Sequence, residues 1–357
     1  MAPSESDQTP SEERTRRSRR KQGEQARMTE VAERAGVSVM SVSRTIRDPE
    51  RVSRKIRERV EKAMRETGYI PNALASSLAS NRTRVAAVIV PFINASFGDT
   101  IHGITDVLEE AGYELLIGQI HHAVEREERL VEAFLSRRVD CLVLTGCTHS
   151  ETTIERLRNG RIPVVETWNL AEDPIDSVVG FSNYEAGRAM TRYLIGKGRK
   201  RIAYLGAPTE GNDRARDRER GYIDAMEEAG LPHDRKVRAY RPLALREGAD
   251  GCQELLERAP DIDALFAASD TLAVGALFHC VKRGLSIPDD IAVAGFDDAD
   301  IAAVIHPSLT TVRVPRYEIG RRAAMLLAQR LDGVDGEDDY VQRTVDVGFE
   351  IIIRDSA

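Results

Sequence analysis

The sequence has few cysteines and no long apolar run. Its 357 residues include four cysteines, at Cys141, Cys147, Cys252 and Cys280, with no C-x-x-C spacing. This scatter argues against a metal site and a disulfide framework, and it favours a reducing cytosol. No apolar stretch approaches the roughly 20 residues that cross a bilayer, and the N-terminus is polar rather than signal-like. We therefore expect a cytoplasmic protein with no metal, no cofactor and no membrane partner.

The common catalytic motifs are missing as well. No strand-like run is followed by G-x-G-x-x-G, and the chain holds no G-x-x-x-x-G-K-[ST], G-x-S-x-G or H-E-x-x-H. The pair His121 and His122 is not framed by acidic or cysteine ligands, which favours solvated side chains over a metal site. An enzyme would depend on analogy of fold alone, so we predict a binding protein.

Charge is divided unevenly along the chain. Residues 1–84 contain 19 Lys and Arg against 12 Asp and Glu, a balance of +7, whereas the remaining residues contain 32 against 46, a balance of −14. A basic module attached to an acidic body is expected when one end of a chain meets phosphates; a basic solvated surface without a partner is the alternative. Residues 1–26 lack an apolar period and include the run Arg14–Lys21, which predicts a disordered basic tail.

Residues Met28–Arg47 have the spacing of two short helices joined by a tight turn. Ala32 is small enough for the second helix to approach, Gly36 supplies the positive φ that ends the first helix, and Val42 faces back toward Ala32. This pattern predicts a helix-turn-helix, with an ordinary helical hairpin as the alternative. Ser38 is the expected N-cap of the second helix. The exposed face of that helix carries side chains that could fit a DNA major groove: Val39, Met40, Ser41, Ser43 and Arg44.

A third helix and a short hinge complete the basic module. Ser53 is placed to cap an amphipathic helix whose apolar face would close a three-helix core within residues 27–70: Ile56, Val60, Ala63 and Met64. Pro71 then stops the helix, and residues 71–84 include a weakly apolar segment that is too short to be a stable helix alone. That segment could fold against DNA and a second copy, with Leu78 wedged between minor-groove base steps; a flexible linker is the alternative.

Residues 85–357 alternate short apolar runs with amphipathic stretches. The apolar runs begin at Val85, Tyr113, Val139, Ile162, Arg201, Asp263 and Ile291. Such repeated βα units predict an α/β body with parallel sheets that helices cover on both faces. About eleven strands are too many for one comfortable sheet, so we expect two lobes that change over near Gly180, with a ligand in the cleft between them.

Polar side chains stand where several of these strands end. They are Thr145, Ser269 with Asp270, and Asp297 with Asp298, and Arg218 lies in the charged stretch after another strand. Carboxylates accept hydroxyl protons and a guanidinium clamps a carboxylate, so this set suits a polyhydroxylated or anionic small molecule. For each residue, a helix cap or a surface charge is the alternative.

Four motifs in order carry a resemblance to a known family. GVSVMSVSR with its Asp-Pro-Glu turn, GYIPN, AASDTLAVGAL and DDIAVAGFDD resemble the LacI/GalR-type transcriptional repressors from about Met28 to the C-terminus. The resemblance implies a helix-turn-helix headpiece, a hinge helix ordered by DNA, and a two-lobed body like a periplasmic sugar-binding protein. It implies base reading by Val39 and Met40, a groove or phosphate contact by Arg44, a hinge that starts at Asn72, and Leu78 as the minor-groove lever.

The same resemblance implies a ligand and partners. It places the effector-binding positions at Phe97, Thr145, Glu166, Trp168, Arg218, Ser269 and Asp297. DPERVS, IPVVE and VGFSNYEA are similar to the branch that controls gluconate use, which implies gluconate or a related sugar or sugar acid as effector and carbohydrate catabolism as the regulated process. The implied partners are palindromic operator DNA at the bacterial nucleoid and a second copy in a homodimer, with a tetramer left open. A sugar-sensing or solute-binding protein without a DNA function is the alternative from another class.

Overall fold

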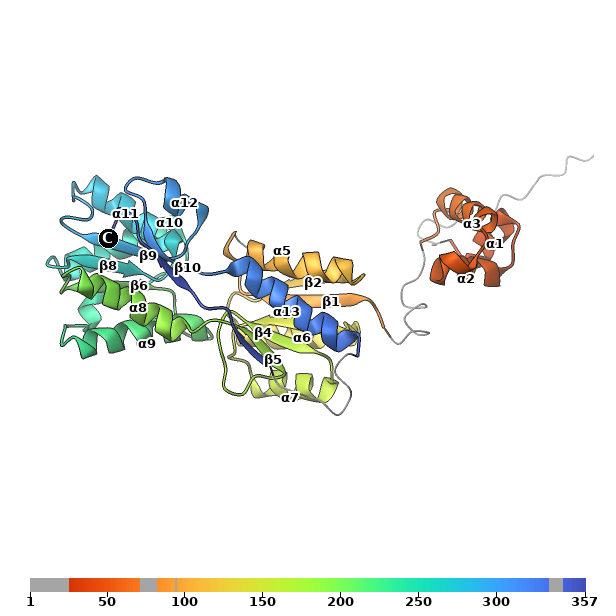
Figure 1. Cartoon of the computed structure of the whole chain (residues 1–357), viewed down its shortest axis with the longest axis horizontal. Helices are drawn as coiled ribbons and strands as arrows, with labels where there is room; N and C mark the ends of the chain where they lie inside the picture. The colour runs from red at the N-terminus through yellow and green to blue at the C-terminus, as the bar shows by residue number, and fades with distance from the viewer. Residues whose placement is uncertain (1–25, 71–81, 94, 334–342) are drawn as a thin grey trace, which may run out of the picture. The chain divides into compact units, whose positions relative to one another are not determined.

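A computed structural model of the chain describes residues 26–70, 82–93, 95–333 and 343–357. The chain forms two compact units, Met1–Asn81 and Arg82–Ala357, and each unit is described by itself (Figure 1). Within the described ranges, no helix is both long enough and apolar enough to cross a membrane.

Within residues 26–70, the N-terminal unit contains three α-helices, α1 (Met28–Ala35), α2 (Val39–Arg47) and α3 (Arg54–Thr67), and the short 3-10 helix η1 (Pro49–Arg51). The predicted end of the first helix is confirmed, because Gly36 follows α1 with a φ of 60°. A Cβ atom at Gly36 would lie 2.7 Å from Nη2 of Arg59, which donates to the carbonyl oxygens of Ala35 and Gly36. Glycine is therefore favoured here for its backbone conformation, and a larger side chain would displace the Arg59 guanidinium that caps α1.

The core of this unit joins one face of each helix. Its buried members are Val31, Ala32, Ala35, Val42, Val60 and Ala63, and Ile56 and Met64 pack against them. The predicted packing of Val42 with Ala32 and the predicted apolar face of α3 are both confirmed. The two predicted caps differ in detail: the hydroxyl of Ser38 accepts a hydrogen bond from the amide of Ser41 at 3.1 Å, whereas Ser53 stands at the N-cap of α3 without a side-chain cap bond.

The first lobe of the body is a parallel six-stranded sheet with the order β11-β5-β4-β3-β1-β2. Its strands are β1 (Val85–Val90), β2 (Glu114–Gln119), β3 (Cys141–Thr145), β4 (Val164–Thr167), β5 (Ser177–Gly180) and β11 (Arg343–Asp346). Its helices are α5 (Ala95–Glu110), α6 (Val124–Ser136), α7 (Glu151–Gly160) and α13 (Arg316–Leu331). β1 and β3 are buried almost throughout, as the continuous apolar runs predicted.

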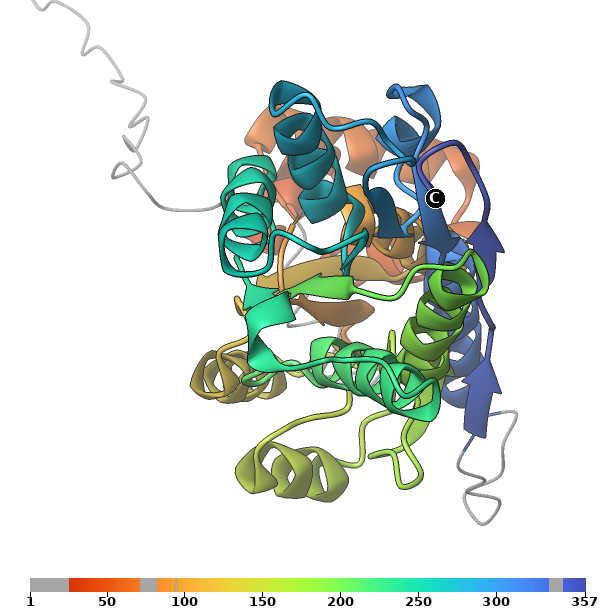
Figure 2. The same ribbon diagram turned by 90° about the vertical axis from the view of Figure 1, so that its left-hand side faces the viewer.

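The second lobe repeats this plan with the strand order β12-β10-β9-β8-β6-β7 and faces the viewer in Figure 2. Its strands are β6 (Ile202–Gly206), β7 (Arg238–Tyr240), β8 (Ala264–Ala267), β9 (Ala292–Asp297), β10 (Thr310–Arg313) and β12 (Glu350–Ile352). Its helical segments are α8 (Asn183–Gly196), α9 (Asp213–Glu228), η2 (Arg235–Val237), α10 (Leu245–Arg258), α11 (Asp270–Lys282) and α12 (Asp300–Val304). Only β12 pairs in the antiparallel direction, with β10. The predicted α/β fold class, a helical headpiece followed by two lobes with parallel sheets, is confirmed.

The chain passes between the lobes three times. It leaves the first sheet after β5, close to the predicted changeover, returns after β10 to form α13 and β11, and crosses again to β12. The return of α13 and β11 was not predicted. α13 packs closely on α5, because Cβ atoms at Gly320 and Gly103 would lie only 2.0 Å from the carbonyl oxygen of Thr100 and 2.2 Å from that of Tyr317. These two glycines allow the backbones of two helices far apart in sequence to touch.

Candidate functional site

Helix α2 divides its residues between the core and the solvent. Val42 and Thr45 are buried, whereas Val39 is 43% exposed, Met40 is 65% exposed, and Arg44 is exposed. Ser41 and Ser43 are half-buried, and the hydroxyl of Ser41 lies 2.9 Å from that of Ser38 within the cap. Two exposed apolar side chains at the start of a capped helix form a surface suited to thymine methyl groups in a major groove.

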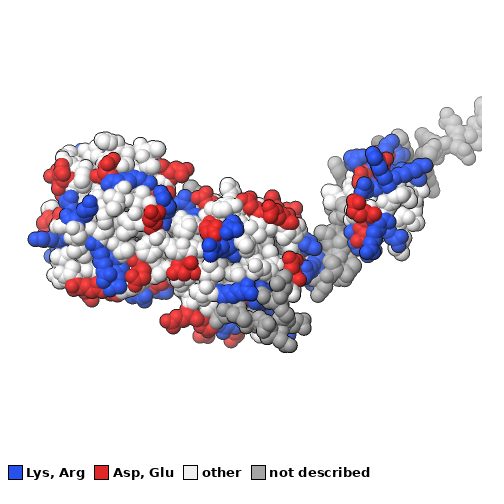
Figure 3. All heavy atoms as spheres, viewed as in Figure 1, with Lys and Arg blue, Asp and Glu red and all other residues white. Residues whose placement is uncertain are grey.

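The charge around α2 supports the same interpretation. Ion pairs occupy Arg34, Arg54 and Arg57 on the other two helices, whereas Arg44 makes no ion pair with any described residue. On the face drawn in Figure 3, Lys and Arg cover much of the N-terminal unit, while both signs are interspersed over the body. An unpaired guanidinium beside the exposed apolar pair is free to contact phosphate. Asn72 and Leu78 of the predicted hinge, and the run Arg14–Lys21, lie outside the described residues.

A pocket opens between the two lobes of the body. Its volume is about 60 Å³, and an adjoining hollow of about 720 Å³ shares four of its wall residues. The first lobe contributes Phe92, Ser96, Phe97, His122 and Trp168; the second contributes Ala207, Asn212, Arg214, Ala215, Arg218, Leu243, Ala268, Ser269 and Asp297. Five of the seven predicted effector positions thus line one cavity: Phe97, Trp168, Arg218, Ser269 and Asp297.

The other two predicted positions lie outside this lining. The hydroxyl of Thr145 donates to the carbonyl oxygen of Ile89 at 2.9 Å, within the sheet. Glu166 accepts a hydrogen bond from the amide of Ile175 at 2.6 Å and lies 3.3 Å from Nε2 of His149. Burial alone would lower the pKa of His149, but Glu127 and Glu166 raise it to about 10. Glu166 is therefore engaged by a buried imidazolium and not by the cavity.

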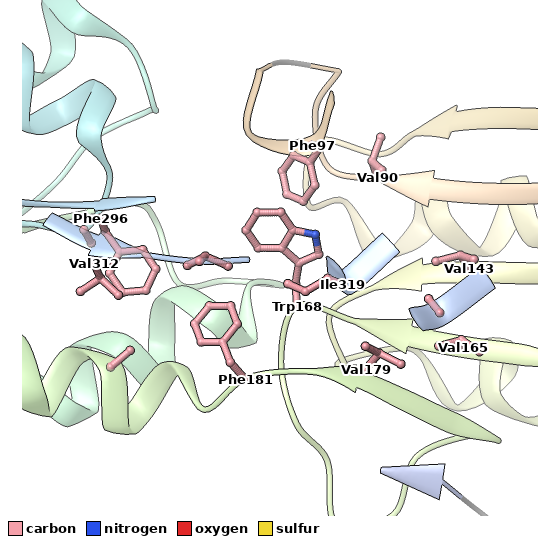
Figure 4. Close-up of a cluster of buried hydrophobic side chains, with 14 of the residues drawn as sticks. Val90, Phe97, Val143, Val165, Trp168, Val179, Phe181, Phe296, Val312 and Ile319 are labelled. Atoms are coloured by element: carbon pink, nitrogen blue, oxygen red, sulfur yellow. The ribbon is translucent and has the colours of Figure 1, made fainter. Parts of the chain in front are cut away.

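An aromatic pair forms the first-lobe wall of the pocket. The rings of Phe97 and Trp168 have centroids 4.7 Å apart, and Figure 4 shows the indole directly below the Phe97 ring. Nε1 of Trp168 is buried without a hydrogen-bond partner among the described residues. The backbone of Trp168 has a φ of 72°, and Asn183 fixes it through a 2.7 Å hydrogen bond to its carbonyl oxygen. A strained backbone and an unsatisfied donor at a cavity wall are typical of a binding site.

A buried arginine and a carboxylate form the second-lobe wall. Arg218 donates to the carbonyl oxygen of Ala268 and, at 2.7 Å, to Oδ1 of Asn183, and its guanidinium carbon lies 3.4 Å from the centroid of the Phe296 ring. These contacts hold the cation in place although it has little access to solvent. Asp297 has a φ of 107°, and its carboxylate accepts no hydrogen bond within the described part of the chain.

Two carboxyl groups of the second lobe have perturbed pKa values: Asp297 in the pocket lining and Asp270, which lies outside it. Burial raises the pKa of Asp297 to about 6, although Arg218 and Arg316 oppose the shift. Burial and the charge of Asp297 raise the pKa of Asp270 to about 7. Asp270 accepts hydrogen bonds from Thr311 and from the amide of Ala299, each at 2.6 Å. The hydroxyl of Ser269 caps α11 by accepting a hydrogen bond from the amide of Thr271 at 3.1 Å. Ser269 therefore serves as a helix cap and also lines the pocket.

The N-terminus of α9 brings side chains to the pocket that the sequence did not single out. Asn212 caps α9 through the amide of Ala215, and Arg214 lines the cavity with its Nη1 atom 3.1 Å from Oδ1 of Asp213. Oδ2 of Asp213 accepts from the amide of Cys147 at 2.8 Å and from Nδ2 of Asn169 at 2.9 Å. Asp213 therefore ties the second lobe to two segments of the first.

The interpretation of the histidine pair as solvated requires a correction. His121 is exposed, as expected, but His122 is half-buried, lines the pocket and stacks edge-on against Phe92 with centroids 5.2 Å apart. Burial and the nearby charge of Arg214 lower the pKa of His122 to about 4, so the imidazole is neutral at physiological pH. Both histidines have positive φ angles, and this local turn directs one ring inward, which composition could not reveal.

Comparison with known proteins identifies the chain. Residues 27–72 match the family described as "Bacterial regulatory proteins, lacI family", and residues 191–357 match a "Periplasmic binding protein-like domain". The chain is 35% identical to the HTH-type transcriptional regulator GntR of Escherichia coli K12 over 326 residues, which covers 91% of this chain and 96% of that protein. IdnR of the same organism is also 35% identical, over 329 residues that cover 91% and 96%. A solved LacI-family regulator from Silicibacter pomeroyi is 34% identical with a TM-score of 0.86 and covers 93% of this chain and 99% of its own.

The chain belongs to the LacI family. The resemblance predicted from its four motifs is therefore confirmed, and the chain is a DNA-binding transcriptional repressor with a sugar-binding type of body. In this LacI-family protein, the three-helix unit lies within the range that matches the lacI family, and most of the second lobe lies within the range that matches the periplasmic binding protein-like domain. The relatives are transcriptional regulators, which disfavours the enzyme alternative.

Proposed function

We propose that this repressor adjusts its affinity for operator DNA according to whether a sugar acid, gluconate or a close relative, occupies the cleft, and that it regulates carbohydrate catabolism in the bacterial cytoplasm. The observation that carries the proposal is the composition of one cavity, which combines the cations Arg214 and Arg218 with the carboxylate of Asp297. Guanidinium groups bind a carboxylate in bidentate geometry, and a carboxylate accepts hydroxyl protons. A polyhydroxylated acid offers both partners.

The rest of the lining fits a sugar-like chain. Asn212 and Ser269 add further polar groups, and the rings of Phe97 and Trp168 offer an apolar wall for carbon-bound hydrogens. The relatives named GntR, IdnR and CytR are 34–35% identical to the chain, so their similarity selects no effector, and the choice of a sugar acid rests on the charges of the lining.

Coupling between the cleft and the DNA is the second part of the proposal. In a two-state regulator, a ligand shifts operator affinity only by its difference in affinity for the two states. The bonds from Asp213 to Cys147 and Asn169 span the lobes, so a ligand beside Arg214 lies next to the contacts that hold the lobes together. Linkage is reciprocal: operator DNA must change effector affinity by the same factor, typically about 5- to 150-fold, by which effector changes operator affinity.

Calorimetry with gluconate and glucose tests the ligand. We expect gluconate to bind and glucose, which lacks the carboxylate, to bind at least about tenfold more weakly, because one lost charge-assisted contact costs about 1.5–3 kcal/mol. Arg214→Gln should weaken gluconate binding, whereas Arg220→Gln, at an arginine on α9 that is 61% exposed at its side chain and outside the pocket lining, should leave it unchanged. Equal binding of both sugars, or no effect of saturating gluconate on operator affinity, would exclude gluconate as the effector.

A further inference from the structure

A second pocket lies at the outer edge of the second sheet. It is enclosed by the edge strand β7, the segment η2 and the end of α10, and its volume is about 470 Å³. Its lining includes Arg235, Arg238, Tyr240, Arg241, Glu254 and Arg258. None of its residues belongs to the cleft between the lobes or to the hollow that adjoins it. This pocket, which we call the arginine pocket, is therefore a separate cavity.

The charge of the arginine pocket opposes that of the body around it. The residues after position 84 have a balance of −14. Four guanidinium groups nevertheless converge on this one cavity, where they face two carboxylates, Glu254 in the lining and Glu219 beside it. The four guanidinium groups and two carboxylates leave an excess of two positive charges. The pocket is therefore a locally positive site on a body whose net charge is negative.

Most guanidinium donors in the arginine pocket are not used by these carboxylates. Nη1 of Arg238 lies 2.9 Å from Oε1 of Glu219, which also accepts from the hydroxyl of Tyr240. Glu254 accepts a hydrogen bond from Nη2 of Arg241 and forms an ion pair with Nη2 of Arg258. Each guanidinium has five N–H groups, so these pairs orient the arginines and leave donors over.

Arg235 contributes a free cation at the rim. It is exposed, and it forms no ion pair with any of the residues that the structure describes. Paired arginines beside a free one form an arrangement that can bind phosphate or carboxylate groups through bidentate hydrogen bonds. The volume lies within the range of about 300–1,000 Å³ that small-molecule sites occupy.

We propose that the arginine pocket binds a small polyanion, a molecule that carries two or more phosphate or carboxylate groups. The ligand neutralises the two excess charges and bridges Arg235 at the rim to Arg258 and Arg238 within. This site is distinct from the cleft, because the two cavities share no lining residue.

Titration of the full chain with pyrophosphate, at constant ionic strength, tests the proposal, and citrate provides a parallel arm. We expect one or both probes to bind with saturation, with pyrophosphate the tighter if phosphate is the natural group and citrate the tighter if carboxylate is. The double variant Arg235→Gln/Arg258→Gln should lose at least tenfold in affinity. Arg246→Gln is the matched control, because Arg246 lies on the same helix α10, is 90% exposed at its side chain and is outside the pocket.

The single variant Arg235→Gln is a test that should not disturb folding, because the side chain of Arg235 is exposed and forms no ion pair with the residues that the structure describes. It should weaken binding several-fold while the melting temperature without ligand stays unchanged. If the double variant bound the probes with unchanged affinity, the anion would bind elsewhere, on the basic N-terminal unit or in the cleft, and the proposal would be wrong. Absence of saturable binding by both probes would overturn it as well.

Discussion

At the scale of single residues, the pocket keeps a carboxylate where its charge is unfavourable. Asp297 combines an unusual backbone angle, a raised pKa and no described hydrogen-bond donor to its side chain. Its neighbour Asp298 is the opposite case, since it pairs at 2.7 Å with both Arg313 and Arg354. Groups that lower the stability of the unliganded fold are retained where binding needs them.

Stability should therefore depend on pH in opposite senses at these two residues. Because the folded pKa of Asp297, about 6, exceeds its usual value of 3.8, ionisation disfavours the folded state as pH rises through that window. Asp297→Asn should raise the melting temperature of the unliganded chain by a few degrees at pH 8 and leave it unchanged near pH 4.

The variant Asp298→Asn is the matched control for this measurement. Burial alone would raise the pKa of Asp298, but Arg313 and Arg354 hold it below its usual value, so its ionised form stabilises the fold and that contribution is lost as pH falls. Asp298→Asn should lower the melting temperature at pH 8. A fall for both variants in thermal scans would show that Asp297 is stabilised by partners in the fold.

Strand ends predicted only part of the cavity lining. Ser269 and Asp297 follow parallel strands and line the cavity, whereas Thr145, Asp270 and Asp298 also follow strands and lie outside its lining. Phe97 was implied by the family resemblance and not by a strand end. His122 and Arg214 were missed because loops and helix starts direct them, and the path of a loop depends on tertiary contacts. Hydrophobic periodicity has no information about such contacts.

At the scale of elements, the sequence predicted most of the parallel strands, but it did not predict which sheet each C-terminal element joins. Apolar runs identified seven parallel strands, β1, β2, β3, β4, β6, β8 and β9, whereas the short strands β5 and β7 were not among the predicted runs. The runs could not show that α13 and β11 return to the first lobe, because a periodic pattern defines an element and not its neighbours. The paired glycines Gly103 and Gly320 make that return possible, but a glycine in a helix is no signal by itself.

Helix α2 leads to a prediction about DNA specificity. Changing Val39 and Met40 together should alter which bases are preferred, by about 1–3 kcal/mol per base pair, because exposed apolar groups at the helix start discriminate thymine methyls. Arg44→Ala should instead weaken all operators alike and reduce the salt slope by about one, as expected for a phosphate contact.

Selection from a randomised operator library, followed by binding at several salt concentrations, separates these outcomes. Arg34→Ala is the control for charge, because Arg34 already pairs with Glu66 on α3. If the variant at Val39 and Met40 ranked all operators as the parent does, α2 would not be the recognition helix.

At the scale of the whole molecule, features of both units favour association with a second copy of the chain. A headpiece of three short helices offers too little surface for tight specific binding, and two-fold protein symmetry matches two-fold operator symmetry. The body exposes apolar side chains where a second copy could cover them: Phe278 and Val281 on α11, and Leu116 and Ile117 on the edge strand β2. We therefore expect a homodimer on a palindromic operator, with α11 and β2 in its interface.

Phe278→Glu should break this dimer, because it would bury a charge at a position that is 55% exposed in the single chain. Sedimentation should then show a monomer whose operator affinity falls by orders of magnitude, since only one half-site is contacted, while effector binding in the cleft persists. Val304→Glu is the control, as Val304 is an equally apolar and more exposed residue on α12. If the variant Phe278→Glu remained dimeric and bound operator normally, the dimer interface would lie on another face of the body. If a monomer protected a single asymmetric half-site, the protein would not bind operator as a dimer.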